Sequence, residues 1–315
     1  MKTDNSKFNK HAWILAAIFC TMLWGSATPM IKLGYEAFQI DTSNAYNVIL
    51  FAGLRFFGAG FLTLLAAYPL TREKPRFYPG ILLPASILAL IQTAGQYIFF
   101  YLGLALVTGS VGSLLTSTNV FFTVILSTII LRSEKLTAKK ILATILGLIG
   151  IIILNLDGNL HFEFRLTGEG FVLLSALANA IANLCMRQFS QNHNPVSLTG
   201  FQFVLGGLSL MIVGFLGGGR IMYPGLGGVF ILFYLMLLSV FAYGIWAMLL
   251  KNHPTSHVVI FSSMVPVFGA FFSWLILGEN IWKWQTLLAL LAIAIGILLV
   301  NYKPRKKIVE NIRFT

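Results

Sequence analysis

The chain has 315 residues, of which 57% are hydrophobic and only 10% are charged, whereas a soluble domain carries roughly 25% charged residues. So little charge cannot coat a globular surface, which excludes soluble, disordered and fibrous proteins. The apolar residues suffice for about nine or ten membrane-spanning helices of about 20 residues each, and the net charge of +12 makes the chain strongly basic.

Long apolar segments follow one another along the chain, and stretches such as 141–154 are apolar all round, as a helix in lipid is. We predict ten helices, in chain order 12–33, 46–68, 80–100, 109–131, 138–156, 169–188, 196–216, 228–250, 256–277 and 283–301. The first follows a basic stretch, as a signal peptide would, but it lacks a small-residue cleavage site, so we expect it to be retained. The predicted fold class is an all-α polytopic membrane protein with ten transmembrane helices.

The positions of Lys and Arg predict the orientation, because cytoplasmic loops carry the excess of these residues. If the N-terminus is cytoplasmic, the external side receives only Lys32, Arg165, Arg220 and Lys283, and Arg55 lies within the membrane. Most of the 22 basic residues then face the cytoplasm, so we expect both termini there. In this interpretation the positive charge anchors the helices against an anionic leaflet, and nucleic acid is not an expected partner.

The two halves of the chain share a plan. When residues 112–156 are placed over 257–301, Glu134 falls on Glu279, although the identity is low. Each half then ends in a polar helix, a short turn and an apolar helix. Because each half has five predicted helices, the second half enters the membrane from the opposite side. We therefore expect two inverted five-helix repeats, an arrangement that places a transporter's substrate site between the repeats near the membrane midplane.

Several short segments resemble those of one transporter family. They are Trp24–Gly25–Ser26 followed by Lys32, residues 51–56, residues 131–134 and 277–280 at the turns of two helical hairpins, and the spacing from Pro266 to Glu279. With these segments in this order, the chain resembles a ten-helix, EamA-type member of the drug/metabolite transporter superfamily over about residues 12 to 301. The resemblance implies a carrier in a bacterial-type cytoplasmic (inner) membrane, with a central cavity, that usually moves amino acids or other small metabolites outward.

This plan divides the chain into a cytoplasmic N-terminal tail, a first EamA-like repeat, an external linker, a second repeat and a basic cytoplasmic C-terminal tail. The respective residues are 1–11, 12–156, 157–168, 169–301 and 302–315. The expected partners are a small-molecule substrate and the lipid bilayer, with no cofactor and no metal. The apolar fifth and tenth helices leave open whether they meet lipid or a second copy of the chain in a homodimer.

Polar side chains within the apolar segments are the candidates for a substrate cavity, because a polar group in hydrocarbon needs a partner or water. Some recur at helical spacing, such as Gln92 and Gln96. Hydroxyls and glycines equally serve as contacts between helices, whereas a carboxamide has four hydrogen-bonding positions to satisfy, which favours a cavity. The candidate cavity residues are Trp24, Thr28, Lys32, Arg55, Gln92, Gln96, Asn119, Asn179, Asn183, Ser262, Tyr243 and Trp246.

Arg55 is the candidate with the strongest physical constraint, because it is a charged residue within a predicted membrane helix. If its helix begins near Tyr46, Arg55 lies roughly 13 Å below the outer end, where a charge costs about 2.5 to 3.5 kcal/mol. Its side chain must therefore face protein or water, and either a substrate carboxylate or the carbonyls of a helix broken near Pro29 would satisfy it. For Lys32, an interfacial ion pair with Glu36 one turn later is the simpler interpretation.

Three prolines inside predicted helices are hinge candidates, because proline removes a helical hydrogen bond and kinks the helix. They are Pro29, Pro84 and Pro266. Rocking of the two repeats about such kinks would expose a central cavity to each side of the membrane in turn.

All ten acidic residues lie in predicted loops, tails or helix ends, and the five histidines also lie near the predicted interfaces. Proton-driven exporters commonly use an embedded carboxylate whose pKa is shifted by burial. We therefore expect a facilitator driven by the substrate gradient, or coupling through another site.

The sequence thus predicts an exporter or facilitator of small metabolites such as amino acids, working by alternating access. The alternatives are an uptake carrier for a sugar, purine or other metabolite, a multidrug exporter and, more remotely, a non-transporting membrane scaffold. We do not expect an enzyme, because the sequence has neither an H-E-x-x-H face nor a central His and Asp set beside a serine.

Overall fold

The computed structural model describes residues 12–107, 112, 115–130, 136–154, 164–278 and 284–301. All regular structure in these residues is helical, and no strand occurs among them. Within these ranges, seven helices are each long and apolar enough to cross a membrane. The expected all-α, multi-pass membrane protein is therefore confirmed, whereas ten crossings in two inverted repeats stay a prediction.

The described residues of the first half form five helical stretches, of which the third has three parts. They are α1 (Ala12–Ala37), α2 (Ala45–Thr71), α3 (Pro79–Leu88) continued by η1 (Ala89–Gly95) and α4 (Gln96–Leu104), α6 (Asn119–Ile130) and α7 (Ala138–Leu154). The segment η1 is π-helical and joins two α-helical parts without a break. Glu134 lies outside the described residues.

The second half repeats this pattern of long helices with short irregular parts. Its elements are η2 (Leu166–Gly170) continued by α8 (Phe171–Phe189), α9 (Pro195–Leu216), α10 (Gly225–Asn252), α11 (Thr255–Val259) continued by η3 (Ile260–Met264) and α12 (Val265–Leu277), and α13 (Trp284–Asn301). The segment η3 is a 3-10 helix. Glu279 also lies outside the described part of the chain.

Asparagine side chains begin two of the spanning helices. The Oδ1 atom of Asn44 accepts a hydrogen bond from the backbone N–H of Tyr46 at the start of α2. At the start of α9, Asn194 Oδ1 accepts from the N–H groups of Val196 and Ser197, and proline occupies the first helical position, where its missing N–H is not needed. These caps explain why the helices begin where they do.

Two of the three hinge candidates, Pro84 and Pro266, lie near helix irregularities. Helices α1 and α3 run through Pro29 and Pro84 without interruption, whereas Pro266 lies in the first turn of α12. The π-helical η1 begins shortly after Pro84, and the 3-10 turn η3 directly precedes α12. Such mid-helix irregularities often mark functional hinges, so the hinge role of these prolines stays a prediction.

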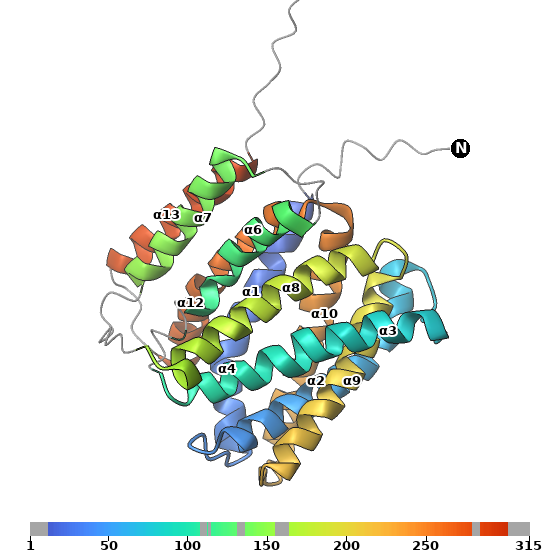
Figure 1. Cartoon of the computed structure of the whole chain (residues 1–315). Coiled ribbons are helices and arrows are strands. Elements are labelled where there is room, and N and C mark those ends of the chain that lie inside the picture. The colour runs from blue at the N-terminus through green and yellow to red at the C-terminus, as the bar shows by residue number, and fades with distance from the viewer. Residues whose placement is uncertain are drawn as a thin grey trace, which may run out of the picture.

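Helices α2 and α9 lie side by side (Figure 1) and bring the two halves of the chain into contact. Glycines allow this approach. A Cβ atom on Gly207 of α9 would lie 2.3 Å from the backbone nitrogen of Phe57, and one on Gly60 of α2 would lie 2.6 Å from that of Val204. The two backbones therefore touch with no side chain between them, as in small-residue contacts of membrane helices.

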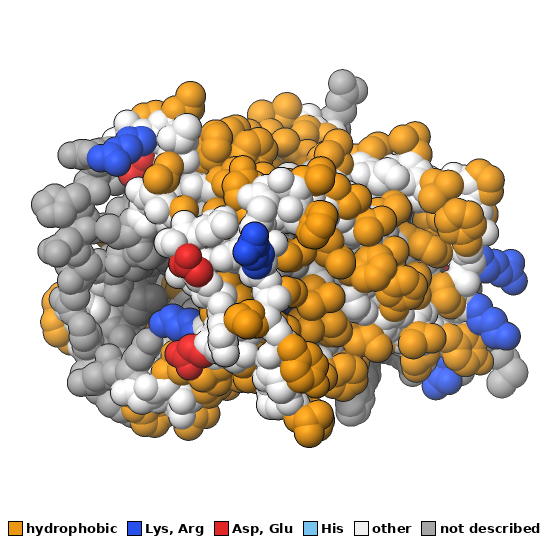
Figure 2. Space-filling view, turned by 90° about the horizontal axis from the view of Figure 1, so that it is seen from below, with side chains coloured by type: hydrophobic (Ala, Val, Ile, Leu, Met, Phe, Trp, Pro, Cys, Tyr) orange, Lys and Arg blue, Asp and Glu red, His pale blue; other side chains and the backbone are white. Residues whose placement is uncertain are grey.

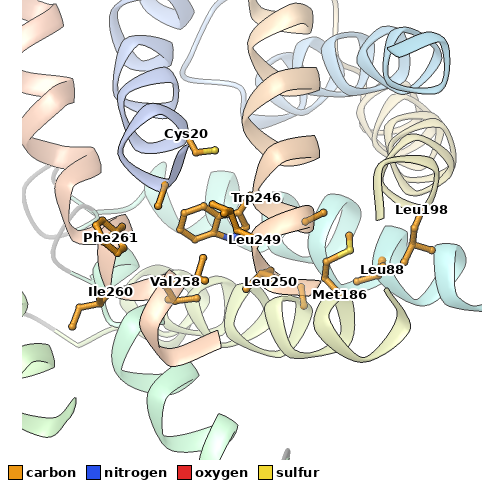
Figure 3. Packing of buried hydrophobic residues seen from close by; sticks show 14 of the residues in the cluster. Cys20, Leu88, Met186, Leu198, Trp246, Leu249, Leu250, Val258, Ile260 and Phe261 are labelled. Atoms are coloured by element: carbon orange, nitrogen blue, oxygen red, sulfur yellow. The ribbon is translucent and has the colours of Figure 1, made fainter. Parts of the chain in front are cut away.

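Helix α10 is central, since it contacts α1, α2, α8 and α9. Figure 3 shows the main buried cluster around it, where side chains from α1, α3, α8, α9, α10, α11 and η3 converge. Trp246 of α10 belongs to this cluster and is only 4% exposed. Helices α7 and α13 instead pair with each other along one edge of the molecule (Figure 1).

The outer surface is largely hydrophobic. In the face shown in Figure 2, apolar side chains cover most of the area, and Lys and Arg are few. Leu65, Phe230 and Leu90 are 75%, 71% and 69% exposed, although each lies within a helix long enough to cross a membrane. Contiguous apolar surface of this kind suits contact with lipid.

Candidate functional site

A chain of amide side chains links α4, α6 and α8 inside the bundle. The Oδ1 atom of Asn179 in α8 accepts hydrogen bonds from Asn119 Nδ2 at 2.9 Å and from Asn183 Nδ2 at 3.0 Å, and Asn179 Nδ2 donates to Gln96 Oε1 at 3.0 Å. One turn further along α8, Asn183 Oδ1 accepts from the indole Nε1 of Trp246 at 3.1 Å. Five predicted candidates thus form one continuous network between the two halves of the chain.

Gln92 takes part in a different contact. Its Oε1 atom accepts a hydrogen bond from Gln202 Nε2 of α9 at 2.6 Å. In a regular α-helix Gln92 and Gln96 would point the same way, but η1 is π-helical and has more residues per turn. The two glutamines, which sequence spacing groups together, therefore bond to different helices.

Trp24 of α1 joins an aromatic cluster beside the amide network. Its ring centroid lies 5.1 Å from that of Tyr243 and 4.9 Å from that of Trp246, both edge-on. The Tyr243 hydroxyl in turn shares a hydrogen bond of 2.7 Å with the Tyr97 hydroxyl. The Nε1 atom of Trp24 is buried and has no hydrogen-bond partner among the described residues, which leaves one donor available to a ligand or water.

Arg55 lies in the middle of α2 and is 5% exposed. Its Nε and Nη2 atoms both donate to the Oγ atom of Ser239 in α10, at 3.1 and 3.0 Å, and the Ser239 hydroxyl donates to Leu235 O. Nη1 forms no hydrogen bond with any residue that the structure describes. The partner of Arg55 is thus one hydroxyl of α10 and not the carbonyls near Pro29, so its hydrogen-bonding capacity is only partly used.

Four tyrosines surround the guanidinium group. Tyr35, Tyr97, Tyr101 and Tyr243 all lie close enough to interact with the charge of Arg55. Neutral hydroxyls solvate a cation but do not neutralise it. This environment is polar and aromatic, and it leaves the positive charge uncompensated.

No acidic side chain within the described segments approaches the middle of a spanning helix. The Asp and Glu residues of these segments are Glu36, Asp41, Glu73 and Glu169. Glu36 lies in the last turn of α1, and Asp41 and Glu73 lie in loops. Glu169 is 5% exposed but lies in η2, where its Oε2 accepts from the backbone N–H of Arg165. Arg55 therefore has no carboxylate partner in this part of the chain.

Three predicted candidates take part in none of the contacts described above. Thr28 and Lys32 of α1 are exposed. Ser262 lies in η3, where its hydroxyl donates to Val259 O at 2.6 Å. On the same face of α1 as Thr28, Gly25 packs against the backbone of α12 near Phe268. This face of α1 therefore contacts another helix at Gly25 and is exposed at Thr28.

Sequence reasoning missed several residues of the site. Gln202 is fully buried in α9, and the criterion that selected Gln92, a carboxamide in an apolar segment, would also have found it. Tyr101 follows Tyr97 by one helical turn, so the same stripe would have included it. No local signal identifies Ser239 as the partner of Arg55, because that contact depends on how α2 and α10 pack.

The arrangement has the chemistry to bind a polar solute. It supplies amide donors and acceptors, aromatic faces and one cation. No group of three or more His, Cys, Asp or Glu residues within the described ranges could hold a metal ion.

Comparison with known proteins relates the whole chain to transporters. The model of the EamA-like transporter family matches residues 11–156 and again residues 166–302. An uncharacterized transporter of Bacillus subtilis, YoaV, is 25% identical over 94% of this chain and 99% of its own length. A probable amino-acid metabolite efflux pump of Salmonella typhimurium is 26% identical over 88% of this chain and 91% of its own length.

A crystal structure of another protein has the same fold. It superimposes with a TM-score of 0.75 at 17% sequence identity and covers 92% of this chain and 96% of that one. At this identity the likeness concerns the fold alone.

Proposed function

The chain belongs to the EamA-like transporter family, and from this premise we propose that it carries small metabolites with a carboxylate group, amino acids among them. In this proposal ten helices cross the inner membrane as two inverted repeats, with both termini cytoplasmic. Seven long apolar helices support it, and α6, α7 and α13 would supply the other crossings. The substrate passes between the repeats by alternating access.

The incomplete coordination of Arg55 carries the proposal for a carboxylate. A buried charge is unfavourable unless it is paired. Among the described residues, however, Arg55 hydrogen-bonds to one serine hydroxyl only, and its other neighbours are neutral tyrosines and the ring of Phe56, 5.1 Å away. A carboxylate matches the planar guanidinium group and bonds to two of its N–H groups at once. The substrate would therefore bring the missing negative charge, and the Nη1 atom would be the first to receive it.

The rest of the site supports a substrate that also has an amino group. The amide oxygens of Gln96, Asn119 and Asn183 are acceptors suited to an ammonium group, and the face of Trp24 adds a cation–π surface. The name of the Salmonella relative, a probable amino-acid metabolite efflux pump, agrees with this chemistry.

Movement of the repeats would follow from exchange of hydrogen bonds. The bond from Asn179 to Gln96 and the bond between Tyr97 and Tyr243 both join the first half of the chain to the second. A substrate that replaces these bonds with its own would release the halves to rock, while the glycine contact of α2 and α9 remains the pivot.

The charge distribution supports a facilitator driven by the substrate gradient. A proton relay through the membrane needs an embedded titratable group, and the described carboxylates all lie at helix ends or in loops. Flux that collapses when the proton gradient is removed, at fixed substrate gradient and membrane potential, would contradict this part of the proposal.

Counterflow in proteoliposomes tests the proposed function. Vesicles preloaded with a mixed amino-acid pool should take up labelled neutral and aromatic amino acids saturably, with or without a proton gradient. The decarboxylated amines should not be carried. Arg55→Gln should raise the KM about ten- to a hundredfold, since hydrogen bonds to charged groups contribute about 1.5 to 3 kcal/mol, and Gln96→Ala should weaken uptake less.

Arg220→Gln is the matched control, because Arg220 is exposed in the loop before α10; its uptake should equal that of the unaltered protein. Arg55→Lys should keep part of the activity, because it retains the charge but not the fork of donors. Equal transport of amines and amino acids would contradict the role of Arg55. If folded protein exchanges no amino acid, the substrate belongs to the alternative classes of sugars, purines or drugs.

A further inference from the structure

A groove of about 250 Å³ opens far from Arg55, where the loop between α2 and α3 meets the loop between α8 and α9. Its lining includes Glu73, Lys74 and Arg76 from the first loop and His193 and Ser197 from the second loop and α9. In the orientation predicted from Lys and Arg, this end of the molecule faces the cytoplasm, at the level of the lipid headgroups.

Side-chain bonds between the two loops shape the groove. Asn194 Nδ2 donates to Thr71 Oγ1 and to Glu73 Oε2, both at 2.8 Å, while its Oδ1 caps α9. On the other wall, the Tyr78 hydroxyl and His193 Nδ1 form a hydrogen bond, and their rings are stacked with centroids 5.8 Å apart. The groove is therefore held open by defined contacts between the two halves of the chain.

The electrostatics of the groove favour an anion. Lys74 and Arg76 are exposed and form no ion pair with the residues that the structure describes. The N-terminus of α9, a helix of 22 residues, points its partial positive charge at the same place. Glu73 is the one acid of the lining, and its bond to Asn194 holds it in the wall.

Ser197 supplies an independent sign of a missing ligand. Ser197 is among the residues that line the groove and is 2% exposed, and its Oγ atom is buried with no hydrogen-bond partner among the residues described. Its backbone N–H is already used by the cap. A buried hydroxyl without a partner is unfavourable, so an acceptor brought by a ligand would complete it.

We propose that this groove is a binding site for a phosphate group, carried by an anionic lipid headgroup or by a soluble phosphorylated metabolite. Lys74 and Arg76 supply the charge, as is usual for phosphate recognition, and the Ser197 hydroxyl donates to a phosphate oxygen. Glu73 limits the affinity by repulsion. The site is separate from the transport site, so it concerns anchoring or regulation and does not depend on the identity of the carried substrate.

Thermal unfolding of the purified full-length protein tests the site, with inorganic phosphate as the probe and chloride at matched ionic strength as the reference. Phosphate should raise the Tm saturably. Arg76→Gln should weaken the apparent affinity about tenfold, as expected for loss of a charge-assisted bond, and Ser197→Ala should weaken it less. Glu73→Gln keeps the acceptor for Asn194 but removes the repulsion, so it should bind phosphate more tightly.

Arg72→Gln is the control, because Arg72 is exposed in the same loop but does not line the groove. If Arg72→Gln weakens binding as much as Arg76→Gln, the effect is general surface charge and the proposal is overturned. The same holds if phosphate gives no saturable rise, or if Glu73→Gln weakens binding.

Lipid nanodiscs identify the source of the phosphate group. In discs of phosphatidylglycerol, a lipid-filled groove should abolish the response to inorganic phosphate, whereas discs of phosphatidylcholine should preserve it. A response that persists equally in both lipids assigns the site to a soluble phosphate. In either case the transport activity of Arg76→Gln in counterflow stays measurable, so failure of this site is distinguishable from failure of the proposed function.

Discussion

Single residues of the site differ in how far the protein satisfies them. The amides of Asn179 and Asn183 bond to each other and to neighbouring helices, whereas Arg55 Nη1 and Trp24 Nε1 have no hydrogen-bond partner among the described residues. A ligand gains the most binding free energy at buried donors that have no partner, because binding there replaces no internal hydrogen bond. In the proposed function, Arg55 and Trp24 are therefore the residues at which we expect selectivity for a substrate to be decided.

His253, which follows the last turn of α10, is a residue whose charge affects stability. Its ring stacks on Trp13 with centroids 4.7 Å apart. Burial lowers the pKa of His253 below its ordinary value of 6.5, and the charges of Arg187 and His257 add to this effect. The folded protein thus favours the neutral ring, so the stabilisation is complete above pH 6.5 and is lost as the pH falls through the lower pKa of the folded state.

We expect the Tm of the protein in detergent to fall between about pH 7.5 and about pH 5.5 more steeply than the Tm of His253→Gln. Glutamine has no proton to gain, so only the wild type is destabilised by protonation at this position. The other histidines are the same in both proteins and cancel in the comparison. Equal slopes in both would mean that His253 does not carry the pH dependence.

Among the elements, the contact of α2 and α9 is the one most sensitive to volume. Gly207→Ala would bring a Cβ to 2.3 Å from the Phe57 backbone nitrogen, and overpacking of this kind costs about 1 to 3 kcal/mol. We expect a clear fall in Tm for Gly207→Ala. Gly227→Ala is the control, because a Cβ there meets nothing within 4 Å. A similar fall in both variants would show a general effect of alanine rather than a tight contact.

Helical periodicity predicted the elements well and their irregular parts poorly. The expected helix at 80–100 corresponds to one stretch from Pro79 to Leu104, because length and hydropathy determine where a chain stays in lipid. The π-helical turn within it has no signal in periodicity. The sequence therefore placed Gln92 and Gln96 on one face, whereas in the structure they point to different helices. The amides of α8 lie in regular helix, and Asn179 and Asn183 do line up as the spacing predicts.

For the whole molecule, the sequence predicted the class, the family resemblance and most members of the polar network. It did not predict which polar residues are partners, since Arg55 meets Ser239 across 184 positions of sequence. Contacts of that kind depend on which helices pack together, and the lipid-facing and core-facing sides of these helices are both apolar. The interior of a membrane protein therefore leaves a weaker trace in sequence than the interior of a soluble one.

The predicted orientation can be checked by labelling cysteines from outside. Lys74→Cys, in the loop between α2 and α3, should react with a membrane-impermeant maleimide only after the membrane is opened, and Arg220→Cys should react in intact cells. Both positions are exposed, whereas the native Cys20 is buried and Cys185 is half-buried. The unsubstituted protein measures their background, and the reverse pattern of labelling would overturn the orientation.

The closed network of amides and tyrosines has a consequence for how tightly such a carrier holds its cargo. Each hydrogen bond that a substrate forms with Asn179 or Tyr243 displaces one that the empty protein already makes. Most of the polar contacts therefore add little to the free energy of binding. The net gain in binding free energy comes from the few groups without a hydrogen-bond partner among the described residues, above all Arg55 Nη1. If Arg55 and Trp24 bind the substrate as proposed, weak binding favours rapid release. An inhibitor that reaches Arg55 and Trp24 while leaving the amides bonded to each other should then bind more tightly than the substrate and hold the two halves together.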